Sequence, residues 1–321
     1  MRRLICAAIL ASLSPSVSAQ NAPFTPVGSI AVPGDMLRID GGRAYLAAGN
    51  TLTILDISNP AAPKRAGAYE LPDRIWGFSV KGSRAYMACD LHGVEILDVS
   101  NPSKVTRAGY YKTKGQAHSV DIFGKTALVA DHMLGVVYLD ISNEATPVLL
   151  GSVFVEGYPR YLAVFGSLYT PSIHQRASTL SILRRQSRSI LWARSRPRTQ
   201  ALAASSPSVF PTSPTRRARR SPSSRAAGCC RFTTCRSLAA PVLLSTLATP
   251  GRGGRMAMKG RTAHVADNAQ GIQVVDLSTP SKPRIASSYK TAKPALDVAL
   301  VDSLVYVVTG RDELVILRQT P

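Results

Sequence analysis

The sequence ILDISNP at residues 54–60 occurs again, with small changes, at three later places in the chain. These copies are EILDVSNP at residues 95–102, YLDISNEATP at residues 138–147 and VVDLSTP at residues 274–280. Each copy contains one aspartate, and the first three aspartates follow one another at intervals of 42 residues. The C-terminal LVILRQTP places Arg318 another 42 residues beyond the fourth aspartate. Self-similarity at such a period indicates a repeat architecture.

Each later copy lies in a period that begins with a glycine and an apolar run. The runs are GSRAYMACD at residues 82–90, GKTALVAD at 124–131, GSLYT at 166–170 and GRTAHVAD at 260–267. One period contains four runs rich in Val, Ile, Leu and Tyr, bounded by Gly, Asn and Pro, as strands are. Helical periodicity is absent from these stretches. Four strands in about 40 residues is the size of one β-propeller blade.

The ILDVSNP phrase, with the strand of the form G-x-A-Y-V-A-D before it, resembles the LVIVD repeat. Proteins of this family are bacterial and archaeal secreted or surface proteins that are associated with β-propellers, and the family has no general assigned activity. The resemblance covers residues 24–170 and 256–321, about two thirds of the chain. It implies an all-β propeller, but a fold by itself does not imply a function.

The repeat arithmetic predicts seven blades. The distance from Asp56 to Arg318 is 262 residues, which is six steps of 42 with 10 left over for an insertion. The chain ends on a strand, and TPVGSIAV at residues 25–32 resembles the strand that follows Pro60. We therefore expect the N-terminal strand to complete the last blade, because this closure removes exposed sheet edges.

One segment, residues 171–254, does not match the repeat. It is rich in Ser, Pro and Ala and contains 15 Arg but no Lys, Asp or Glu, whereas the rest of the chain has 24 basic and 19 acidic residues. The formal net charge of +20 therefore arises mainly from this segment. The sequence predicts a signal peptide at 1–19, blades one to the start of four at 20–170, this aberrant segment, and the last two blades at 255–321.

Two of the seven predicted blades would have to lie within residues 171–254, and we interpret that segment as frameshifted. Suppose that each original codon consists of the last base of one codon in the present reading frame and the first two bases of the next codon. Translation in that frame restores residues that the repeat predicts. Two Asp and one Gly then stand 42 positions beyond Asp131, Asp140 and Gly135, provided that the preceding third base is G. The alternative is a genuine disordered insertion, because Ser, Pro and Arg would not bury a core.

The first residues indicate export. MRRLICAAILASLSPSVSAQ has a basic start, an apolar run and small residues before Gln20, which is a signal-peptide pattern with cleavage expected after Ala19. The apolar run is too short to span a bilayer, and no other segment has that length. We expect a secreted, periplasmic or cell-surface protein that is not membrane-spanning. A secreted protein rarely meets nucleic acid, so the arginines do not predict a nucleic-acid partner.

The repeated aspartates serve something that every blade needs. We interpret them as structural residues that cap the turn after the strand by bonding nearby backbone amides. They are Asp56, Asp98, Asp140 and Asp276. Cys229, Cys230 and Cys235 lack the fourth ligand of a structural zinc site. His92 and His132 lie in loops, where solvated histidines compete with a surface metal pair. The sequence predicts no cofactor, no metal site and no catalytic residue.

A varied row of positions carries the candidate site. Six residues before the turn glycine, where the innermost strand begins, the blades carry Trp76, His118, Arg160 and Leu296. Such strand starts ring the mouth of a propeller's central channel, where ligands bind. Trp76, His118 and Arg160 are therefore the candidate ligand-binding residues. The alternative is that they are ordinary strand-start side chains.

These observations predict a non-catalytic binding, adhesion or interaction module whose partner is an unknown protein or an envelope or extracellular ligand. One alternative is a propeller hydrolase or lyase with its site at the channel mouth. That chemistry needs a convergent acid–base or metal set, and the candidate row supplies neither a nucleophile nor three metal ligands. A second alternative is a non-functional frameshifted product. Oligomeric state is not predicted.

Overall fold

The computed structural model describes the backbone of residues 24–153, 159–165, 168–173, 183–184, 228–234, 242–279 and 281–320. Side chains are described for residues 24–153, 247–279 and 281–320. The expected signal peptide at 1–19 and most of the aberrant segment at 171–254 lie outside the described residues. Within the part described, no helix is long and apolar enough to cross a bilayer.

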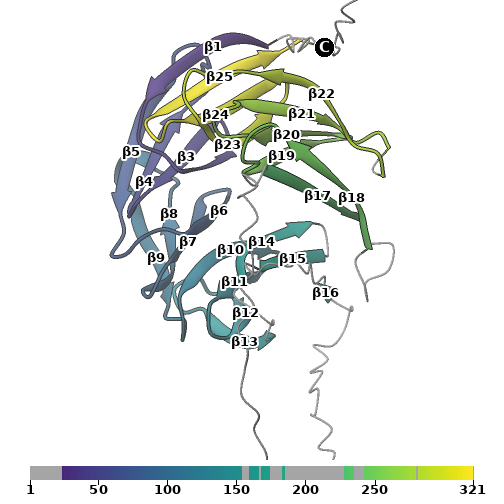
Figure 1. The fold of residues 1–321 in the computed structure, drawn as a ribbon. Coiled ribbons are helices and arrows are strands. Elements are labelled where there is room, and N and C mark those ends of the chain that lie inside the picture. Colours follow the sequence, from purple (N-terminus) through teal and green to yellow (C-terminus); the bar gives the residue numbers. More distant parts are fainter. Residues whose placement is uncertain are drawn as a thin grey trace, which may run out of the picture.

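The described chain is all-β and has the predicted propeller architecture. Antiparallel sheets follow one another around a ring (Figure 1), and the sole helical element described is the 3-10 turn η1 (Pro102–Lys104). Five sheets have four strands, one has three and one has two. The count of seven blades therefore stays a prediction, whereas the four-stranded blade is confirmed.

The first three sheets follow the 42-residue period. The first sheet contains β2 (Met36–Asp40), β3 (Arg43–Ala48), β4 (Thr51–Asp56) and β5 (Lys64–Glu70). The second contains β6 (Gly77–Lys81), β7 (Arg84–Cys89), β8 (Gly93–Asp98) and β9 (Thr106–Tyr111). The third contains β10 (Ala117–Phe123), β11 (Thr126–Asp131), β12 (Gly135–Asp140) and β13 (Val148–Val153).

The next two sheets are the small ones. The fourth contains β14 (Pro159–Phe165), β15 (Leu168–Ile173) and β16 (Leu183–Arg184), and the fifth contains β17 (Gly228–Thr234) and β18 (Val242–Thr249). The sixth sheet is complete, with β19 (Met256–Lys259), β20 (Thr262–Ala266), β21 (Ile272–Asp276) and β22 (Arg284–Tyr289). Within the described residues, the two incomplete sheets thus lie where the repeat is lost.

The seventh sheet confirms the predicted use of the N-terminal strand. It contains β23 (Ala295–Val301), β24 (Leu304–Thr309), β25 (Glu313–Gln319) and, as its outermost strand, β1 (Phe24–Ala31). β1 pairs antiparallel with β25 and has a bulge between Pro26 and Gly28. The outermost strands of the first three sheets and of the sixth have a bulge at the corresponding place. β1 is therefore equivalent to a fourth strand.

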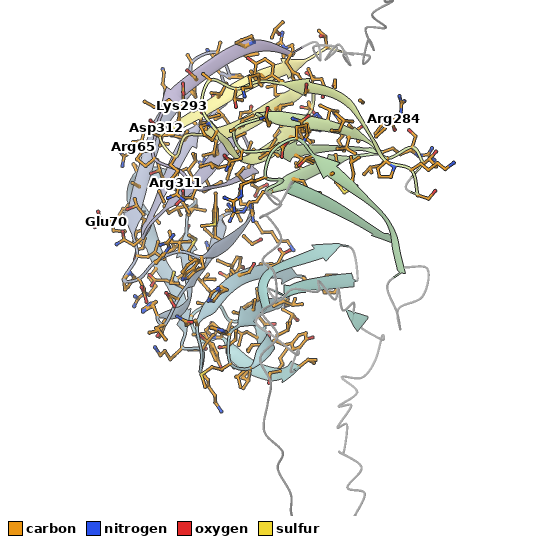
Figure 2. The ribbon with its side chains drawn as sticks, in the orientation of Figure 1. Arg65, Glu70, Arg284, Lys293, Arg311 and Asp312 are labelled. Carbon is orange, nitrogen blue, oxygen red and sulfur yellow. The ribbon has the colours of Figure 1, made fainter. Side chains whose placement is uncertain are left out.

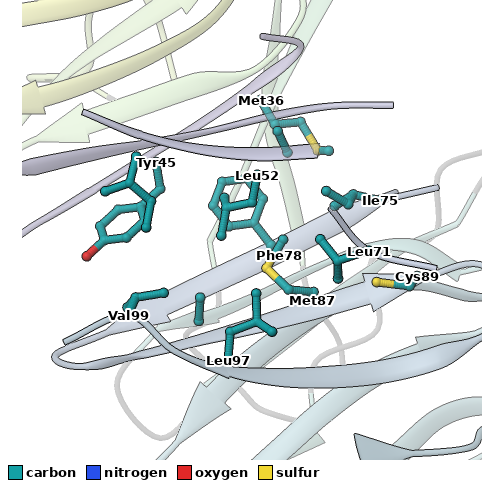
Figure 3. Close-up of a cluster of buried hydrophobic side chains, with 13 residues drawn as sticks. Met36, Tyr45, Leu52, Leu71, Ile75, Phe78, Met87, Cys89, Leu97 and Val99 are labelled. Atoms are coloured by element: carbon teal, nitrogen blue, oxygen red, sulfur yellow. The ribbon is translucent and has the colours of Figure 1, made fainter. Parts of the chain in front are cut away.

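The hydrophobic core lies between neighbouring sheets, because the middle strands of the five four-stranded sheets bury apolar side chains on both faces. One cluster joins the first and second sheets through Tyr45, Leu52, Phe78 and Met87, each at most 1% exposed (Figure 3). Similar clusters join the second sheet to the third, the sixth to the seventh, and the seventh to the first. A blade buries its faces only against its neighbours, which explains why this sequence repeats.

The innermost strands are β2, β6, β10, β14, β19 and β23. β2, β6 and β10 contact one another in series, β10 contacts β14, and β23 contacts both β19 and β2. These strands line the centre of the ring. The connections that enter them, and the loops between second and third strands, lie at one end of the sheets because the strands alternate in direction. We call this end the loop face.

Candidate functional site

The predicted row lies at the start of the innermost strands, on the loop face. His118, Arg160 and Leu296 each occupy a β-bulge, because the pairing of first and second strands skips that residue. Trp76 directly precedes β6, and its backbone N–H donates to the carbonyl of Ala88 at 2.9 Å. Bulges re-aim side chains and are common next to binding sites. The backbone therefore sets this row apart from the regular strand that follows.

Two further members of the row are missing from the sequence prediction. Asp35 and Gly254 also stand six residues before a turn glycine, and their N–H groups donate to second-strand carbonyls at 2.8 Å, as Trp76 does at 2.9 Å. Asp35 adds a carboxylate to the mouth and pairs with Arg311, with Nε and Oδ1 3.2 Å apart. Counting six residues back from each turn glycine is enough to identify both residues in the sequence.

Five side chains from the second and third sheets form one contiguous group, which we call the mouth cluster: Arg74, Trp76, Asp90, His118 and His132. The Trp76 and His118 rings stack with centroids 5.1 Å apart and an interplanar angle of 12°. The Arg74 guanidinium lies 4.5 Å from the Trp76 ring centroid. Trp76 Nε1 donates to Asp90 Oδ2 at 2.9 Å, and His132 meets the His118 ring edge-on at 5.5 Å. The cluster holds the indole ring in one orientation.

The structure changes the interpretation of His118. Its side chain is 6% exposed, because it lies between the rings of Trp76 and His132. A buried imidazole in this position supports the indole of Trp76 and has little surface to offer a ligand. The backbone of Arg160 belongs to β14, and its side chain lies outside the described residues. Among the three predicted ligand-binding residues, Trp76 is therefore the one that is shown to be partly exposed to solvent.

The polar groups of the mouth cluster include one buried oxygen that has no partner among the described residues. Asp90 Oδ1 is buried and has no hydrogen-bond partner among the described residues, which is costly for a carboxylate oxygen. The cluster offers an indole, two imidazoles and this carboxylate. It lacks a serine, cysteine or lysine nucleophile aligned with a base. Such a set can stack against a ligand and exchange hydrogen bonds with it.

The two loop histidines do not form a pair. His92 Nε2 lies 2.9 Å from Glu95 Oε2, and its ring packs on Tyr110 at 4.5 Å. His132 Nδ1 instead lies 2.7 Å from the side-chain oxygen of Gln116. The described residues contain no group of three or more His, Cys, Asp or Glu side chains suited to a metal ion.

The four repeated aspartates have the geometry of turn caps. Each accepts a hydrogen bond at 2.8 to 2.9 Å from the backbone N–H of the serine two residues later. The pairs are Asp56 with Ser58, Asp98 with Ser100, Asp140 with Ser142 and Asp276 with Ser278. The side-chain hydroxyl of the same serine and then this backbone N–H lower the pKa of every one of the four carboxyls. At Asp276, the guanidinium of Arg284 also contributes, and the pKa falls to about 2.

A charged group in the channel is absent from the sequence prediction. Asp297, on β23, is 2% exposed, and its Oδ2 accepts from the backbone N–H of Leu37 at 2.9 Å. The same oxygen lies 3.7 Å from Arg38 Nη1 and 3.6 Å from Arg255 Nη1. Burial raises the pKa of Asp297, and the two guanidiniums oppose that shift. Ring closure brings these residues together from opposite ends of the chain.

Two large apolar side chains protrude from the loop face beside the mouth cluster. Leu91 is 60% exposed and Met133 is 68% exposed. They occupy equivalent positions, 42 residues apart, in the loops between the second and third strands of adjacent sheets. Each is a direct neighbour in sequence of a mouth-cluster residue, Asp90 or His132.

Comparison with protein families supports the repeat assignment. The family described as LVIVD repeat matches residues 34–70, 75–113, 114–155 and 250–291. These ranges cover the first three sheets and the sixth. None of the curated proteins matches the chain.

Solved structures show the same fold at low identity. A chain in the crystal structure of the mitotic checkpoint complex is 9% identical, with a TM-score of 0.63, and 99% of this chain and 98% of that chain are covered. The Pan2 WD40 domain of Neurospora crassa is 11% identical, with a TM-score of 0.59 and coverages of 93% and 96%. BamB from Moraxella catarrhalis is 11% identical, with a TM-score of 0.54 and coverages of 92% and 99%. At such identities the likeness concerns the fold alone.

Proposed function

Because the chain belongs to the LVIVD-repeat family, we propose that it is a non-catalytic binding module that acts outside the cytosol through its loop face. The signal-peptide pattern of residues 1–19 supports the location. The observation that carries the binding role is the exposure of Leu91 and Met133, each next in sequence to a residue of the cluster that holds the indole of Trp76. Preorganised aromatic and apolar anchors contribute most of the affinity at protein interfaces.

The charges around these anchors indicate the chemistry of the partner. Arg74, Lys112 and Lys114 are exposed on the connections that enter β6 and β10 on the same face. Asp73 and Asp90, the nearby carboxylates, are engaged by the backbone of Arg74 and by Trp76 Nε1. We infer a partner with an apolar side chain and acidic groups, such as an acidic protein surface of the cell envelope. Electrostatic complementarity of this kind sets orientation and association rate more than affinity.

A matched pair of surface variants tests the binding role. Immobilised full-length chain is incubated with an envelope extract of the source organism, and retained proteins are quantified. We expect the double variant Leu91→Ser, Met133→Ser to retain less partner, whereas Val148→Ser, whose side chain is 61% exposed on β13, binds as the unchanged protein does. Both variants alter exposed side chains, so their stability should stay within about 0.5 kcal/mol of the unchanged protein. Equal retention by the double variant would refute the loop-face assignment.

We also propose that residues 171–254 are a frameshifted stretch of an original seven-bladed ring. The third sheet supports this proposal, because its outermost strand keeps the glycine, Gly151, and the bulge of the other sheets. In the first and second sheets the equivalent glycines lie against a turn of the following blade. β13 thus keeps the glycine and the bulge against which a complete fourth blade would pack.

Gene sequencing over codons 165–256 tests the frameshift. We expect two further copies of the repeat in another reading frame, each with an Asp in register with Asp140. A clean in-frame gene with no such copies would show that the segment is a genuine insertion. A non-functional product remains the alternative to a binding module if the frameshift lies in the gene itself.

A further inference from the structure

The outermost strand of the third sheet exposes apolar side chains on the outer side of the ring. β13 has the sequence VLLGSV, which contains neither a charged residue nor a proline. Val148 is 61% exposed, Leu149 is 44% exposed and Val153 is 38% exposed. A single apolar side chain is normal on a protein surface, whereas three on one short edge strand indicate a contact surface.

The outermost strands of the other four-stranded sheets are protected at the edge. One and two periods before Val148 and Leu149, the equivalent pairs are Thr106–Arg107 in β9 and Lys64–Arg65 in β5. Arg65 and Glu70 of β5 and Arg284 of β22 lie on the outside of the ring (Figure 2). β1 has a proline instead, Pro26. Charges and prolines on an edge strand prevent it from pairing with another molecule, and β13 lacks both.

The exposure of Val148 and Leu149 does not depend on the incomplete fourth sheet. The equivalent side chains in β5 and β9 are exposed as well, although a four-stranded sheet follows each of these strands in the ring. This place in the blade therefore faces solvent even beside a complete neighbour. The third sheet differs from the first and second in the type of residue that it presents there.

β13 also presents an open hydrogen-bonding edge. Its inner side pairs with β12, and within the described part of the chain no strand pairs with its outer side. Val148 pairs with Asp140, the last residue of β12, so the Val148 end of β13 lies away from the loop face. The edge is therefore a surface distinct from the mouth cluster.

We propose that β13 is a self-association edge, on which the β13 strand of a second copy of this chain pairs antiparallel. Backbone hydrogen bonds between the two strands supply the contact, and apolar side chains that meet across the pair add to it. This inference goes beyond the proposed function, because it concerns the outer side of the ring. The product is a dimer with two loop faces.

The side chains of β13 fit a second copy of the same strand. Two antiparallel copies related by a two-fold axis present one surface to itself. Val148 and Val153 pair with Asp140 and Val136 of β12, so both lie on one face of the sheet. When the two strands align end to end, Val148 meets the partner's Val153 on that face, and the contact occurs twice. Self-pairing desolvates no charged side chain of β13, because the strand contains none.

Sedimentation velocity of the full chain at increasing protein concentration tests the proposal. A reducing agent is present, so that disulfides between the five cysteines do not link chains. We expect the average mass to rise from that of one chain towards that of two, because a two-fold contact closes after one step. A mass that stays at one chain, or that grows without limit past two, overturns the proposal.

Variants assign the contact to β13. Val148→Lys and Leu149→Arg introduce the residues that β5 has at these positions, and each should weaken the dimer Kd by at least about tenfold, because pairing would desolvate the added charge. Thr106→Lys is the matched control, since it adds the same charge at the equivalent position of β9 and should dimerise as the unchanged protein does. An unchanged Tm shows that each variant is folded. If Leu149→Arg does not fold, Val148→Lys, at the more exposed position, carries the test alone.

A dimer that persists with unchanged Kd in the β13 variants would also overturn the proposal. Retention of envelope proteins separates this result from the loop-face function: Val148→Lys should retain them normally, and the double variant Leu91→Ser, Met133→Ser should dimerise normally. A monomeric chain that loses an envelope protein through Val148→Lys would refute self-association and assign the edge to that other protein.

Discussion

At the scale of single residues, the repeated aspartates show how one side chain stabilises a turn without any catalytic role. An ionised carboxylate accepts a hydrogen bond from an amide more strongly than a protonated one does, so bonding lowers its pKa. All four described aspartates show this shift, and Asp276 shows the largest. The turn in each of these four blades thus depends on a charge that acid removes.

Because these carboxyls have lower pKa values in the folded chain, we expect the free energy of unfolding to decrease at acidic pH. We call this decrease the acid limb. The pKa of Asp276 is lower in the folded chain than the unfolded value of about 3.9, so its stabilisation is full above that value. The contribution is lost as the pH falls towards about 2. Asp276→Asn keeps an accepting oxygen but cannot titrate. We expect thermal unfolding of this variant to depend less steeply on pH between those limits.

A variant at an aspartate outside the four turns provides the comparison. Asp73→Asn changes a half-buried loop carboxyl whose Oδ1 accepts a hydrogen bond from the backbone N–H of Arg74. We expect it to keep the full acid limb of the unchanged protein. An acid limb of equal steepness in Asp276→Asn and the unchanged protein would count against a titrating turn cap.

At the residue scale, the hydrogen bonds of the four aspartates agree with the turn-cap interpretation, and the burial of His118 is what the sequence did not indicate. An aspartate two residues before a serine bonds within its own turn, so the local sequence contains the partner that makes the cap. His118 was predicted to face a ligand, but its burial depends on Trp76 and His132 in the folded ring. Packing between blades decides that outcome, and spacing does not encode it.

At the scale of elements, a glycine in the outermost strand sets how closely adjacent blades approach. A Cβ on Gly67 would lie 1.7 Å from the carbonyl oxygen of Pro102, and a Cβ on Gly109 would lie 1.7 Å from that of Glu144. Both neighbours belong to the turn of the next blade. The same position in β1 is Gly28, which approaches the Pro60 carbonyl. The repeat therefore keeps a glycine there for packing between blades.

Gly109→Ala should destabilise the ring. The added methyl would overlap backbone, which cannot move aside as a flexible side chain can, so we expect a loss of at least about 2 kcal/mol in the free energy of unfolding. Ser287→Ala is the control, because Ser287 occupies the equivalent place in β22 and already carries a Cβ. Urea denaturation measures both. A loss below about 0.5 kcal/mol for Gly109→Ala would contradict the close approach.

Elements were the most predictable level. The alternation of apolar and turn residues predicted four strands per period, since strand formation follows local composition. The bulge at His118 was not predicted, because it depends on the pairing with β11. Its position nevertheless coincides with the row that the six-residue count selected.

At the scale of the whole molecule, the N-terminal strand joins the two ends of the chain. Phe24, at the start of β1, is 8% exposed and packs edge-on against Tyr289 of the sixth sheet with ring centroids 5.5 Å apart. β1 also supplies the outer edge of the seventh sheet. One strand thereby completes one blade and fixes it to the preceding blade.

Phe24→Ala should therefore weaken the whole ring. Truncating a buried phenylalanine costs about 3 kcal/mol, and we expect a lower Tm and a lower urea midpoint. Thr25→Ala, at the exposed next position, is the control. An unchanged midpoint for Phe24→Ala would mean that the packing of Phe24 onto the sixth sheet adds nothing to stability.

The sequence by itself determined the repeat period, the strand content, the turn caps and the use of the N-terminal strand in the last blade. Each of these depends on residues that are close in sequence or that recur at a constant interval. Only the tertiary structure decided the burial of His118 and the meeting of Arg38, Arg255 and Asp297. Leu37 N and the Asp297 carboxylate are 260 residues apart, and no local propensity records a contact that exists only because a ring of sheets closes.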